Sequence, residues 1–342
     1  MSSKLARGVR EVRVLQTIRP QRGGNVTNPY ASLLVENLPH DVRSYWFSWP
    51  RALLGRYDVF HVHWIEYLAR TRGWRTPIKA SLFALLLVSL RVRRAAIVRT
   101  AHNIEPHIGG GRLEQRLVSW FDALPATWIV MNRETQVPVT RGVHLIPHGH
   151  YRDWYPIPSA EMPPEPNRLL LFGVLRPNKG IDELLEAVSA CGHPLTMRIV
   201  GKPSGSEIRD AVLGAAARDN RISPRLGFVS DAELAEEIAK CSRVVLPYPR
   251  LHNSGALLLA LSLGRAVLVP ESKLASDLQD EFGTDWVVTY PGGIDAGVIE
   301  WLIDSPMPRG LPNMSGRDWS AIGRMTRDVY LQSLGAEDRL TK

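Results

Sequence analysis

Short apolar runs recur along the first half of the chain, separated by longer stretches in which apolar residues repeat at helical spacing. We expect strands at residues 13–17, 58–64, 95–101 and 127–131, with helices between them such as 77–90 and 111–122. Strands that alternate with helices favour a parallel sheet covered by helices on both faces. The pattern therefore predicts an α/β domain over residues 1–150.

A proline-rich stretch then interrupts the pattern. Residues 151–167 hold five prolines, which exclude both a helix and the interior of a sheet, so we place an interdomain linker there. Alternation resumes afterwards, and a second α/β domain is predicted over residues 168–315. Its expected strands are 168–172, 195–200, 243–246 and 266–269, and its expected helices are 181–190, 231–240 and 256–263. A last helix at 319–334 falls in the C-terminal segment 316–342. The fold class is thus α/β, with two Rossmann-like, doubly wound parallel-sheet domains.

The bulk composition agrees with a folded protein. Of 342 residues, 44% are hydrophobic and 22% are charged. Basic residues are concentrated in the first half, which also holds most of the tryptophans. A basic, Trp-rich half indicates an anionic partner such as a membrane surface, a lipid phosphate or a nucleic acid, and a solvated basic face remains the alternative.

The chain shows no sign of export or of a membrane span. No secretory signal is evident, and the most apolar run, residues 80–90, is about half the ~20 residues that cross a bilayer. We expect it to be a buried helix or, alternatively, an interfacial helix with a basic flank. Cys191 and Cys241 form no disulfide framework and are expected to be buried thiols. The predicted location is the cytoplasm, with peripheral contact at the inner face of a membrane as an extension.

Two loops of the second half have the features of an anion site. In LLLFGVLRPNKG, residues 169–180, an apolar strand ends at Gly173, and the loop then presents Arg176 and Lys179. Ligands of doubly wound sheets bind beyond the carboxyl ends of the strands, and two cations there suit a diphosphate. The next predicted strand ends at Gly201.

The second loop precedes an apolar helix. In LPYPRLHNSGALLLALSLG, residues 246–264, Tyr248, Asn253, Ser254 and Gly255 lie between a strand and the helix start. Unpaired N–H groups at a helix start attract anions, and Gly255 lets a phosphate approach the backbone. A plain helix cap is the simpler alternative for this loop, as a solvated strand–helix loop is for the first.

Histidines gather after two strands of the first half. The period of two places His61 and His63 on the same side of their strand at its carboxyl end, and His102 follows the next strand. With Glu66 and Glu105 nearby, these residues predict a polar pocket that binds sugar hydroxyls or takes a proton from an acceptor. The chain has no Cys pair, HExxH or Asp-x-Asp, so we expect no metal and no cofactor. A P-loop and a dinucleotide fingerprint are also missing.

Together these motifs resemble the group 1 (family 4-like) glycosyltransferases, which have the two-Rossmann GT-B fold with a cleft between the domains. The resemblance spans nearly the whole chain and includes Gly23-Gly24, HVHW at 61–64, TAHN at 100–103, IPHG at 146–149, FGVLRPNKG at 172–180 and residues 246–270. The chain looks most like bacterial exopolysaccharide or glycolipid mannosyltransferases. The resemblance implies a metal-independent hexosyl transfer, with mannose from GDP-mannose expected, from a nucleotide-sugar donor to a lipid-linked or polysaccharide acceptor. It also implies a last helix that crosses back to the first domain.

The same resemblance assigns roles to residues. The donor-binding set is Gly173, Arg176, Lys179, Gly201, Tyr248, Asn253, Ser254 and Gly255; the acceptor- or sugar-binding set is Gly23, Gly24, Asn25, His61, His63 and Asn103; the catalytic candidates are His102, Glu66 and Glu105. In the transition state, cations and N–H groups would stabilise the charge left on the diphosphate.

One departure from the family is clear. Its members usually carry two glutamates in an E-x7-E spacing, whereas residues 251–260 contain no acid, and Leu259 or Ala260 stands at the second position. Retaining and inverting outcomes both stay open, and an inverting reaction would need a base. Two alternative functions also stay open: a nucleotide-sugar 2-epimerase of the same fold, and a non-catalytic sugar-nucleotide-binding or scaffold protein. A nucleic-acid binder is not expected, because no recognised module is present.

Overall fold

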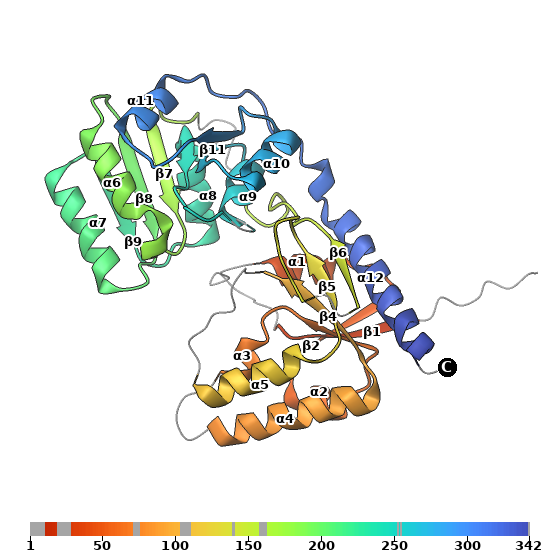
Figure 1. The fold of residues 1–342 in the computed structure, drawn as a ribbon. Helices are drawn as coiled ribbons and strands as arrows, with labels where there is room; N and C mark the ends of the chain where they lie inside the picture. Colours follow the sequence, from red (N-terminus) through yellow and green to blue (C-terminus); the bar gives the residue numbers. More distant parts are fainter. Residues whose placement is uncertain are drawn as a thin grey trace, which may run out of the picture. The chain divides into compact units, whose positions relative to one another are not determined.

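A computed structural model describes residues 11–18, 29–70, 76–102, 111–138, 141–156, 163–251, 253 and 255–340. Their contacts divide the chain into two units (Figure 1). Unit 1 comprises the described residues through Gly149 together with those from Arg317 onward, and unit 2 comprises His150–Gly316. The C-terminal helix is thus part of unit 1, although unit 2 precedes it in the sequence.

Unit 1 is built on a six-stranded parallel sheet with the order β2-β1-β3-β4-β5-β6. The strands are β1 (Val12–Gln16), β2 (Val42–Trp46), β3 (Val59–Val62), β4 (Ala96–Ala101), β5 (Thr127–Val130) and β6 (Gly142–Leu145). The helices are α1 (Tyr30–Glu36), α2 (Trp49–Leu54), α3 (Glu66–Ala69), α4 (Thr76–Arg93), α5 (Arg112–Asp122) and α12 (Trp319–Leu340).

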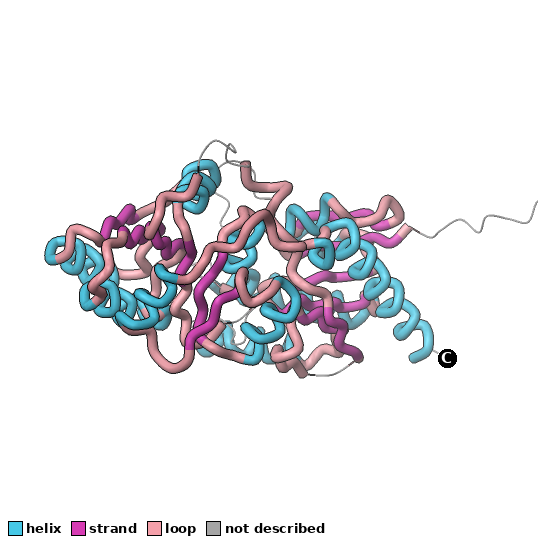
Figure 2. Tube along the Cα trace, turned by 90° about the horizontal axis from the view of Figure 1, so that it is seen from above, coloured by secondary structure: helices cyan, strands magenta, loops and turns pink. Residues whose placement is uncertain are grey.

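The two faces of this sheet are covered by different helices. Helices α2 to α5 share one apolar core with the sheet, in which Phe60, Phe83 and Phe121 are almost fully buried. Helix α12 packs against β4 and α1. Helices on both sides of a parallel sheet make unit 1 doubly wound, as the alternating sequence predicts (Figure 2).

Unit 2 has a second six-stranded parallel sheet, with the order β12-β11-β10-β7-β8-β9. Its strands are β7 (Arg168–Phe172), β8 (Thr196–Gly201), β9 (Ile222–Leu226), β10 (Arg243–Val245), β11 (Ala266–Pro270) and β12 (Val287–Tyr290). Its helices are α6 (Ile181–Ala190), α7 (Ser206–Arg218), α8 (Asp231–Lys240), α9 (Gly255–Ser262), α10 (Lys273–Phe282) and α11 (Ala296–Asp304), and short 3-10 turns lie at Pro177–Lys179 and Ser315–Arg317. The structure confirms two α/β units with parallel sheets.

Each sheet has one point where the strand order changes direction. In unit 1 the chain moves outward from β1 to β2 and later returns to the other side through β3; in unit 2 it moves outward from β7 to β8 and returns through β10. At such switch points the two flanking loops leave in opposite directions, which opens a crevice beyond the carboxyl ends of the strands. The β1/β3 and β7/β10 switch points are therefore the places to look for a site. Across the described residues, no helix is long and apolar enough to span a bilayer.

Candidate active site

The loop after β7 brings a lysine to the switch point of unit 2. Gly180 follows the 3-10 turn with a left-handed φ of 64°, and a Cβ there would lie 2.2 Å from the carbonyl oxygen of Pro247. Only glycine therefore allows this loop to pass so close to the end of β10. Lys179 reaches across, where its Nζ donates to the Tyr248 hydroxyl at 3.2 Å and lies 4.4 Å from the Tyr248 ring centroid.

The electrostatics of this point favour an anionic ligand. Burial lowers the pKa of Lys179 to about 8, and the nearby Arg176 guanidinium adds to the decrease. Within the part of the chain that the structure describes, no carboxylate forms an ion pair with either cation. Two cations brought together without a counter-charge are strained by mutual repulsion, which an anion placed between them would relieve.

Three glycines lie side by side at the carboxyl ends of β7, β8 and β9. Gly173, Gly201 and Gly227 have φ values of 109°, 143° and 128°. Backbone hydrogen bonds of 2.9 Å join the three strand ends: Gly173 N–H donates to the carbonyl of Val200, and Gly227 N–H donates to the carbonyl of Gly201. A Cβ at Gly201 would lie 1.9 Å from the Gly173 oxygen, whereas Cβ atoms at the other two would meet nothing within 4 Å. This glycine ledge leaves the backbone open to close approach by a ligand. The sequence analysis found Gly173 and Gly201 but missed Gly227.

Helix α9 begins beside the β7/β10 switch point. Its first residue, Gly255, lies so close to Tyr151 that a Cβ would be 2.9 Å from the tyrosine hydroxyl. Asn253 precedes it with a left-handed φ of 29°, while the predicted ligand Ser254 lies outside the described residues. Leu259 and Ala260 are buried. The second glutamate position of the family pattern, Leu259 or Ala260 here, therefore belongs to the core and presents no side chain to a ligand.

In unit 1 three of the predicted histidines come together at the β1/β3 switch point. His63 Nδ1 lies 3.0 Å from His102 Nε2, and His63 Nε2 lies 3.1 Å from the side-chain oxygen of Gln16. The His61 and His63 rings are 4.2 Å apart between centroids, so both lie on the same side of β3 as expected. The backbone N–H of His63 also donates to the Thr17 hydroxyl at 3.0 Å.

Burial fixes the charge and the proton positions of this cluster. It lowers the pKa of His63 to about 3, and it lowers the pKa of His61 well below the usual value, with added repulsion from His63 and His102. Because the amide oxygen of Gln16 can only accept, neutral His63 carries its proton on Nε2 and accepts at Nδ1. His102 must then donate from Nε2.

His61 supports the cluster from inside. It is fully buried, its Nδ1 lies 2.7 Å from the Tyr330 hydroxyl of α12, and its Nε2 lies 2.8 Å from the Thr100 hydroxyl. Both ring nitrogens thus have protein partners. His61 therefore supports the cluster structurally, and its acceptor-side contact stays a prediction.

Aromatic rings enclose His102. Trp64 stacks on it at 4.1 Å with an interplanar angle of 24°, and Tyr30 meets it edge-on at 4.9 Å. Tyr30 also contacts His148 and Trp319. These rings restrict His102 to one orientation, with 9% of its surface exposed.

The IPHG motif anchors the start of α12. A Cβ at Gly149 would lie 2.3 Å from the Trp319 ring, and Arg317 Nη1 donates to the carbonyl of His148 at 3.2 Å. Burial lowers the pKa of His148 to about 4, and its Nδ1 lies 2.7 Å from the Gly149 oxygen. The motif therefore packs against the start of the C-terminal helix and holds it to unit 1.

The remaining predicted residues are distributed differently. Glu66 is buried at the start of α3 and acts electrostatically on Arg99, whose side chain lies on the opposite face of β4 from Thr100. The contacts that the structure describes do not connect it to the histidines. Outside the described residues lie Gly23, Gly24, Asn25, Asn103 and Glu105. The sequence analysis did not predict that Gln16, Tyr330 and Tyr30 contact the histidine cluster. Of the three, only Gln16 has a local sequence signal, because it is a polar residue at the end of an apolar strand.

One group of potential metal ligands occurs among the described residues, and it lies elsewhere. The ligand atoms of Cys191, His193 and Glu300 are within 4.8 Å of one another. Cys191 and His193 follow the end of α6 and precede β8, so they lie at the amino ends of the strands, away from Lys179. Both cysteines are buried thiols, as predicted.

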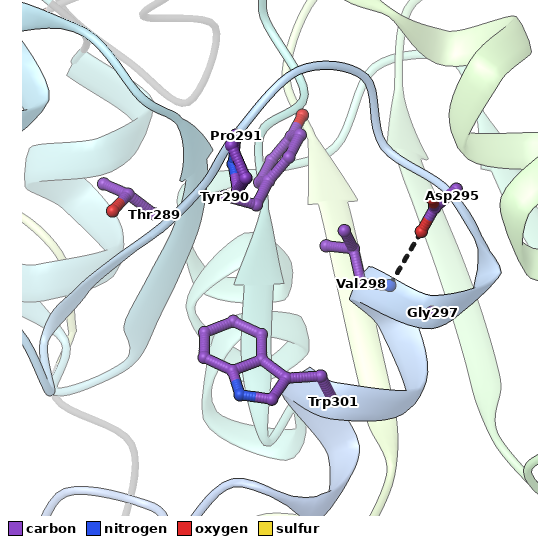
Figure 3. A pocket seen from close by; sticks show the side chains of 7 residues that line it. All are labelled: Thr289, Tyr290, Pro291, Asp295, Gly297, Val298 and Trp301. Atoms are coloured by element: carbon purple, nitrogen blue, oxygen red, sulfur yellow. Dashed lines mark hydrogen bonds between the residues drawn. The ribbon is translucent and has the colours of Figure 1, made fainter.

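A cavity of about 340 Å³ lies beside β12 and the start of α11 (Figure 3). Tyr290, Val298 and Trp301 line it together with Asp295, whose Oδ1 accepts the N–H of Val298 at 2.9 Å as a helix cap. It includes none of the predicted donor residues, so it is distinct from the β7/β10 switch point.

Comparison with known proteins identifies the family. The family model described as glycosyl transferases group 1 matches residues 166–299. The chain is 43% identical over 318 residues to the GDP-mannose:glycolipid 4-beta-D-mannosyltransferase of Xanthomonas campestris pv. campestris, which covers 91% of this chain and 90% of that protein.

Solved glycosyltransferases share the fold across both units. Anabaena HepE in complex with UDP-glucose has a TM-score of 0.58 at 14% identity, covering 96% of this chain and 99% of that chain. WaaG, a glycosyltransferase involved in lipopolysaccharide biosynthesis, has a TM-score of 0.55 at 14% identity, covering 96% and 100%. With a curated relative at this identity, two doubly wound units and a motif set at both switch points, the chain belongs to the group 1 glycosyltransferases and is an enzyme of the GT-B fold.

Proposed function

We propose that this enzyme transfers mannose from GDP-mannose to the sugar of a glycolipid and needs no metal ion. The single observation that carries the proposal is the meeting of Lys179 with the β10 loop at the switch point of unit 2, where the cation has no acidic partner among the described residues. The donor and the acceptor class are taken from the curated relative, which is named for both. We also propose that the present enzyme acts in exopolysaccharide assembly at the inner face of a membrane.

The donor would bind along the carboxyl edge of unit 2. Lys179 and Arg176 would pair with the diphosphate, and the N–H groups at the start of α9 would face its distal phosphate. The glycine ledge of Gly173, Gly201 and Gly227 would receive the nucleoside, because its backbone is open to a flat ligand. When the bond between the sugar and GDP breaks, the leaving electron pair stays on the diphosphate, and these preset charges stabilise it.

The acceptor hydroxyl would be activated by His102. The sugar of GDP-mannose is α-linked, so a β-linked product requires inversion and a base on the acceptor side. His102 takes the hydroxyl proton as the acceptor oxygen bonds to the anomeric carbon, and the bond to GDP breaks on the opposite side. The positive charge that forms on His102 is shared with His63 through its Nε2–H. Buried Leu259 or Ala260 stands where retaining members of the family carry their second glutamate. The absence of that acid also supports an inverting reaction.

A two-stage experiment tests the proposal. Calorimetry with GDP-, UDP- and ADP-sugars should register binding for GDP-mannose, and incubation with a glycolipid acceptor should then release GDP and form a β-mannoside detectable by NMR. The His102→Ala variant should keep donor affinity and lose about 10²–10⁴-fold in kcat, the usual contribution of a general base. Turnover of the nucleotide sugar without any acceptor would support the 2-epimerase alternative instead. Absence of heat with every nucleotide sugar would sink the proposal.

A further inference from the structure

Helix α4 is apolar on two opposite faces. Phe83, Leu86 and Leu90 are almost fully buried against the core of unit 1. On the other side Ile78, Leu85, Val88 and Val92 are 55%, 55%, 59% and 75% exposed. Their spacing places them in one stripe along the helix, and Figure 1 shows α4 on the outer side of unit 1. A surface helix of a protein surrounded by water normally carries polar residues on this side.

The neighbouring helix extends the apolar surface. Helices α4 and α5 pack side by side. On α5, Leu113 and Trp120 are 47% and 60% exposed, while Leu117 and Phe121 face the core. An exposed tryptophan beside aliphatic side chains is typical of the boundary between headgroups and acyl chains, where its ring is apolar and its N–H remains hydrated.

Cations surround this stripe. Arg91, Arg93 and Arg94 follow the apolar residues at the end of α4, and Arg112 and Arg116 are exposed on α5. The acid of α5 nearest to them, Glu114, already lies 3.7 Å from Arg70. An apolar stripe with a basic margin complements a bilayer whose surface carries negative charge.

A basic cavity lies at the end of α4. It has a volume of about 360 Å³ and is lined by three arginines, Arg13, Arg56 and Arg93, together with Leu54, Gly55 and Tyr57. Arg93 is held in place by donating to the carbonyls of Leu53 and Gly55, and Arg13 is held by Asp58 at 2.8 Å. These contacts use only some of the five N–H groups of each guanidinium. The cavity is large enough for a phosphate group, and Leu54 beside it is 81% exposed.

We propose that unit 1 docks on an anionic bilayer through this surface, with the stripe of α4 in the interface and a lipid phosphate in the arginine cavity. The α4 surface means Ile78, Leu85, Val88, Val92, Leu113 and Trp120. The four aliphatic side chains distinguish the partner from a nucleic acid, whose binding surfaces combine cations with aromatic side chains. The proposal adds a defined surface to the membrane location included in the proposed function, and it rests on that function only for the statement that the acceptor is a membrane lipid.

Vesicle co-sedimentation of the full chain tests the proposal. Binding to phosphatidylcholine vesicles containing about one third phosphatidylglycerol should exceed binding to pure phosphatidylcholine by roughly tenfold or more, since several arginines each gain from the surface potential. The Val88→Ser/Val92→Ser variant should bind the anionic vesicles roughly tenfold more weakly, because two apolar side chains no longer enter the interface. Arg56→Glu should abolish most of the preference for anionic lipid and leave the weak binding to neutral vesicles.

Matched controls lie in unit 2. Leu213→Ser removes another exposed apolar side chain, 47% exposed, and Arg218→Glu changes the net charge by the same amount as Arg56→Glu. Both should bind vesicles like the wild type. Melting temperatures within a few degrees of the wild type would show that all variants are folded.

The outcome is independent of catalysis. Vesicle binding needs no donor, so it can succeed even where no mannosyl transfer is found. With a short-chain, water-soluble acceptor, the α4 and Arg56 variants should keep wild-type turnover and lose it only with acceptor embedded in vesicles. Equal binding of wild type and variants, equal binding to neutral and anionic vesicles, or release of bound vesicles by a small excess of RNA would each overturn the proposal.

Discussion

Burial acts in two opposite ways on the titratable residues of this enzyme. In unit 2 it leaves Lys179 close to its titration point near neutral pH, beside a second cation that an anion can compensate. In unit 1 it keeps His61 and His63 neutral, so that each ring nitrogen has a fixed donor or acceptor role. Local motifs were sufficient to propose Lys179 and His63 as candidates. Their pKa shifts depend on burial by residues distant in the chain, which no local pattern shows.

The shifted pKa of Lys179 predicts a pH dependence of donor binding. The free enzyme loses the Lys179 proton as the pH passes about 8, whereas the diphosphate needs the charged form. Affinity for GDP-mannose should therefore fall about tenfold between pH 7 and pH 9, following the protonated fraction. Calorimetry at both pH values measures it, and proton uptake on binding at pH 8 should appear as a dependence on buffer ionisation enthalpy.

Two variants control this prediction. Lys179→Arg stays charged at both pH values and should show little change in affinity between them. Arg209→Ala, an exposed position on α7, should leave both affinity and its pH dependence as in the wild type. A wild-type affinity that stays constant from pH 7 to pH 9 would contradict the assignment of Lys179 to the diphosphate.

The buried histidines predict loss of stability in mild acid. In the folded state the pKa values are about 3 for His63 and about 4 for His148, below the ~6.5 of an unfolded chain. Below pH 6.5 the unfolded state thus binds more protons, and the free energy of unfolding falls with the pH. Each of the two should contribute about 1.6 kcal/mol to the loss between pH 6.5 and pH 5. Denaturant titrations across this range measure the slope. His148→Gln should reduce it.

At the scale of elements, the position of a strand in its sheet decided whether the sequence revealed it. The eight predicted strands correspond to β1, β3, β4, β5, β7, β8, β10 and β11, the interior strands of the two sheets. The four that were missed, β2, β6, β9 and β12, are the four edges. Interior strands of a parallel sheet are buried on both faces and form continuous apolar runs. Edge strands are half exposed, and β9 even holds Pro224, which an edge tolerates.

Helix α12 shows a second limit of sequence-based prediction. Its periodicity predicted a helix, but nothing near Tyr330 indicates that its hydroxyl completes the hydrogen bonding of His61 in β3. Contacts of Arg327 with Asp41, at 2.8 Å and 3.0 Å, and of Trp319 with Gly149 hold the same helix to unit 1. Long-range partners of this kind depend on the tertiary fold.

Removal of one hydroxyl on α12 should therefore be costly. In Tyr330→Phe the buried Nδ1 of His61 loses its hydrogen-bond partner, which should lower the free energy of unfolding by about 1–3 kcal/mol. Chemical denaturation measures this value. Arg324→Ala, at an exposed position of the same helix, should change it by less than about 0.5 kcal/mol. Equal effects of the two substitutions would argue against the His61–Tyr330 contact.

A glycine substitution tests the docking of α12 from the residue that the helix packs against, with a second glycine as its control. Gly149→Ala would place a Cβ 2.3 Å from the Trp319 ring, so the ring must move and stability should fall by at least about 2 kcal/mol. Gly111→Ala is the matched substitution, because a Cβ there meets nothing within 4 Å and its cost should stay below about 1 kcal/mol. Thermal melts of both variants provide the comparison, and tryptophan fluorescence should change only for Gly149→Ala.

At the scale of the whole molecule, each unit has its candidate residues at the switch point of its own sheet. Lys179 and Tyr248 follow the two strands that flank the switch in unit 2; in unit 1, Gln16 is the last residue of one flanking strand and His63 follows the other. Once the strand order is known, topology alone therefore points to both candidate sites. The sequence predicted the order of elements along the chain but not their order across the sheets, which is why it found the loops and missed several contacts between them.

The metal-independent reaction is a prediction for the whole enzyme. Cationic side chains and N–H groups are proposed to replace a metal at the diphosphate, so transfer should continue unchanged in excess EDTA. The initial rate of GDP release, measured with and without chelator, decides this. Loss of activity that Mg²⁺ or Mn²⁺ restores would contradict the proposal, and restoration by Zn²⁺ alone would direct attention to Cys191 and His193 instead.

The membership of α12 in unit 1 has a consequence for synthesis on the ribosome. The partner of His61 is Tyr330, separated from it by 269 residues, so every strand of unit 2 is translated before the first sheet receives its last helix. Throughout that interval the nascent first half exposes the apolar surface that Trp319, Ile322 and Tyr330 later cover. Chains that stall or are cleaved before this helix should be recognised by chaperones and proteases as incomplete, even when their second half has already folded.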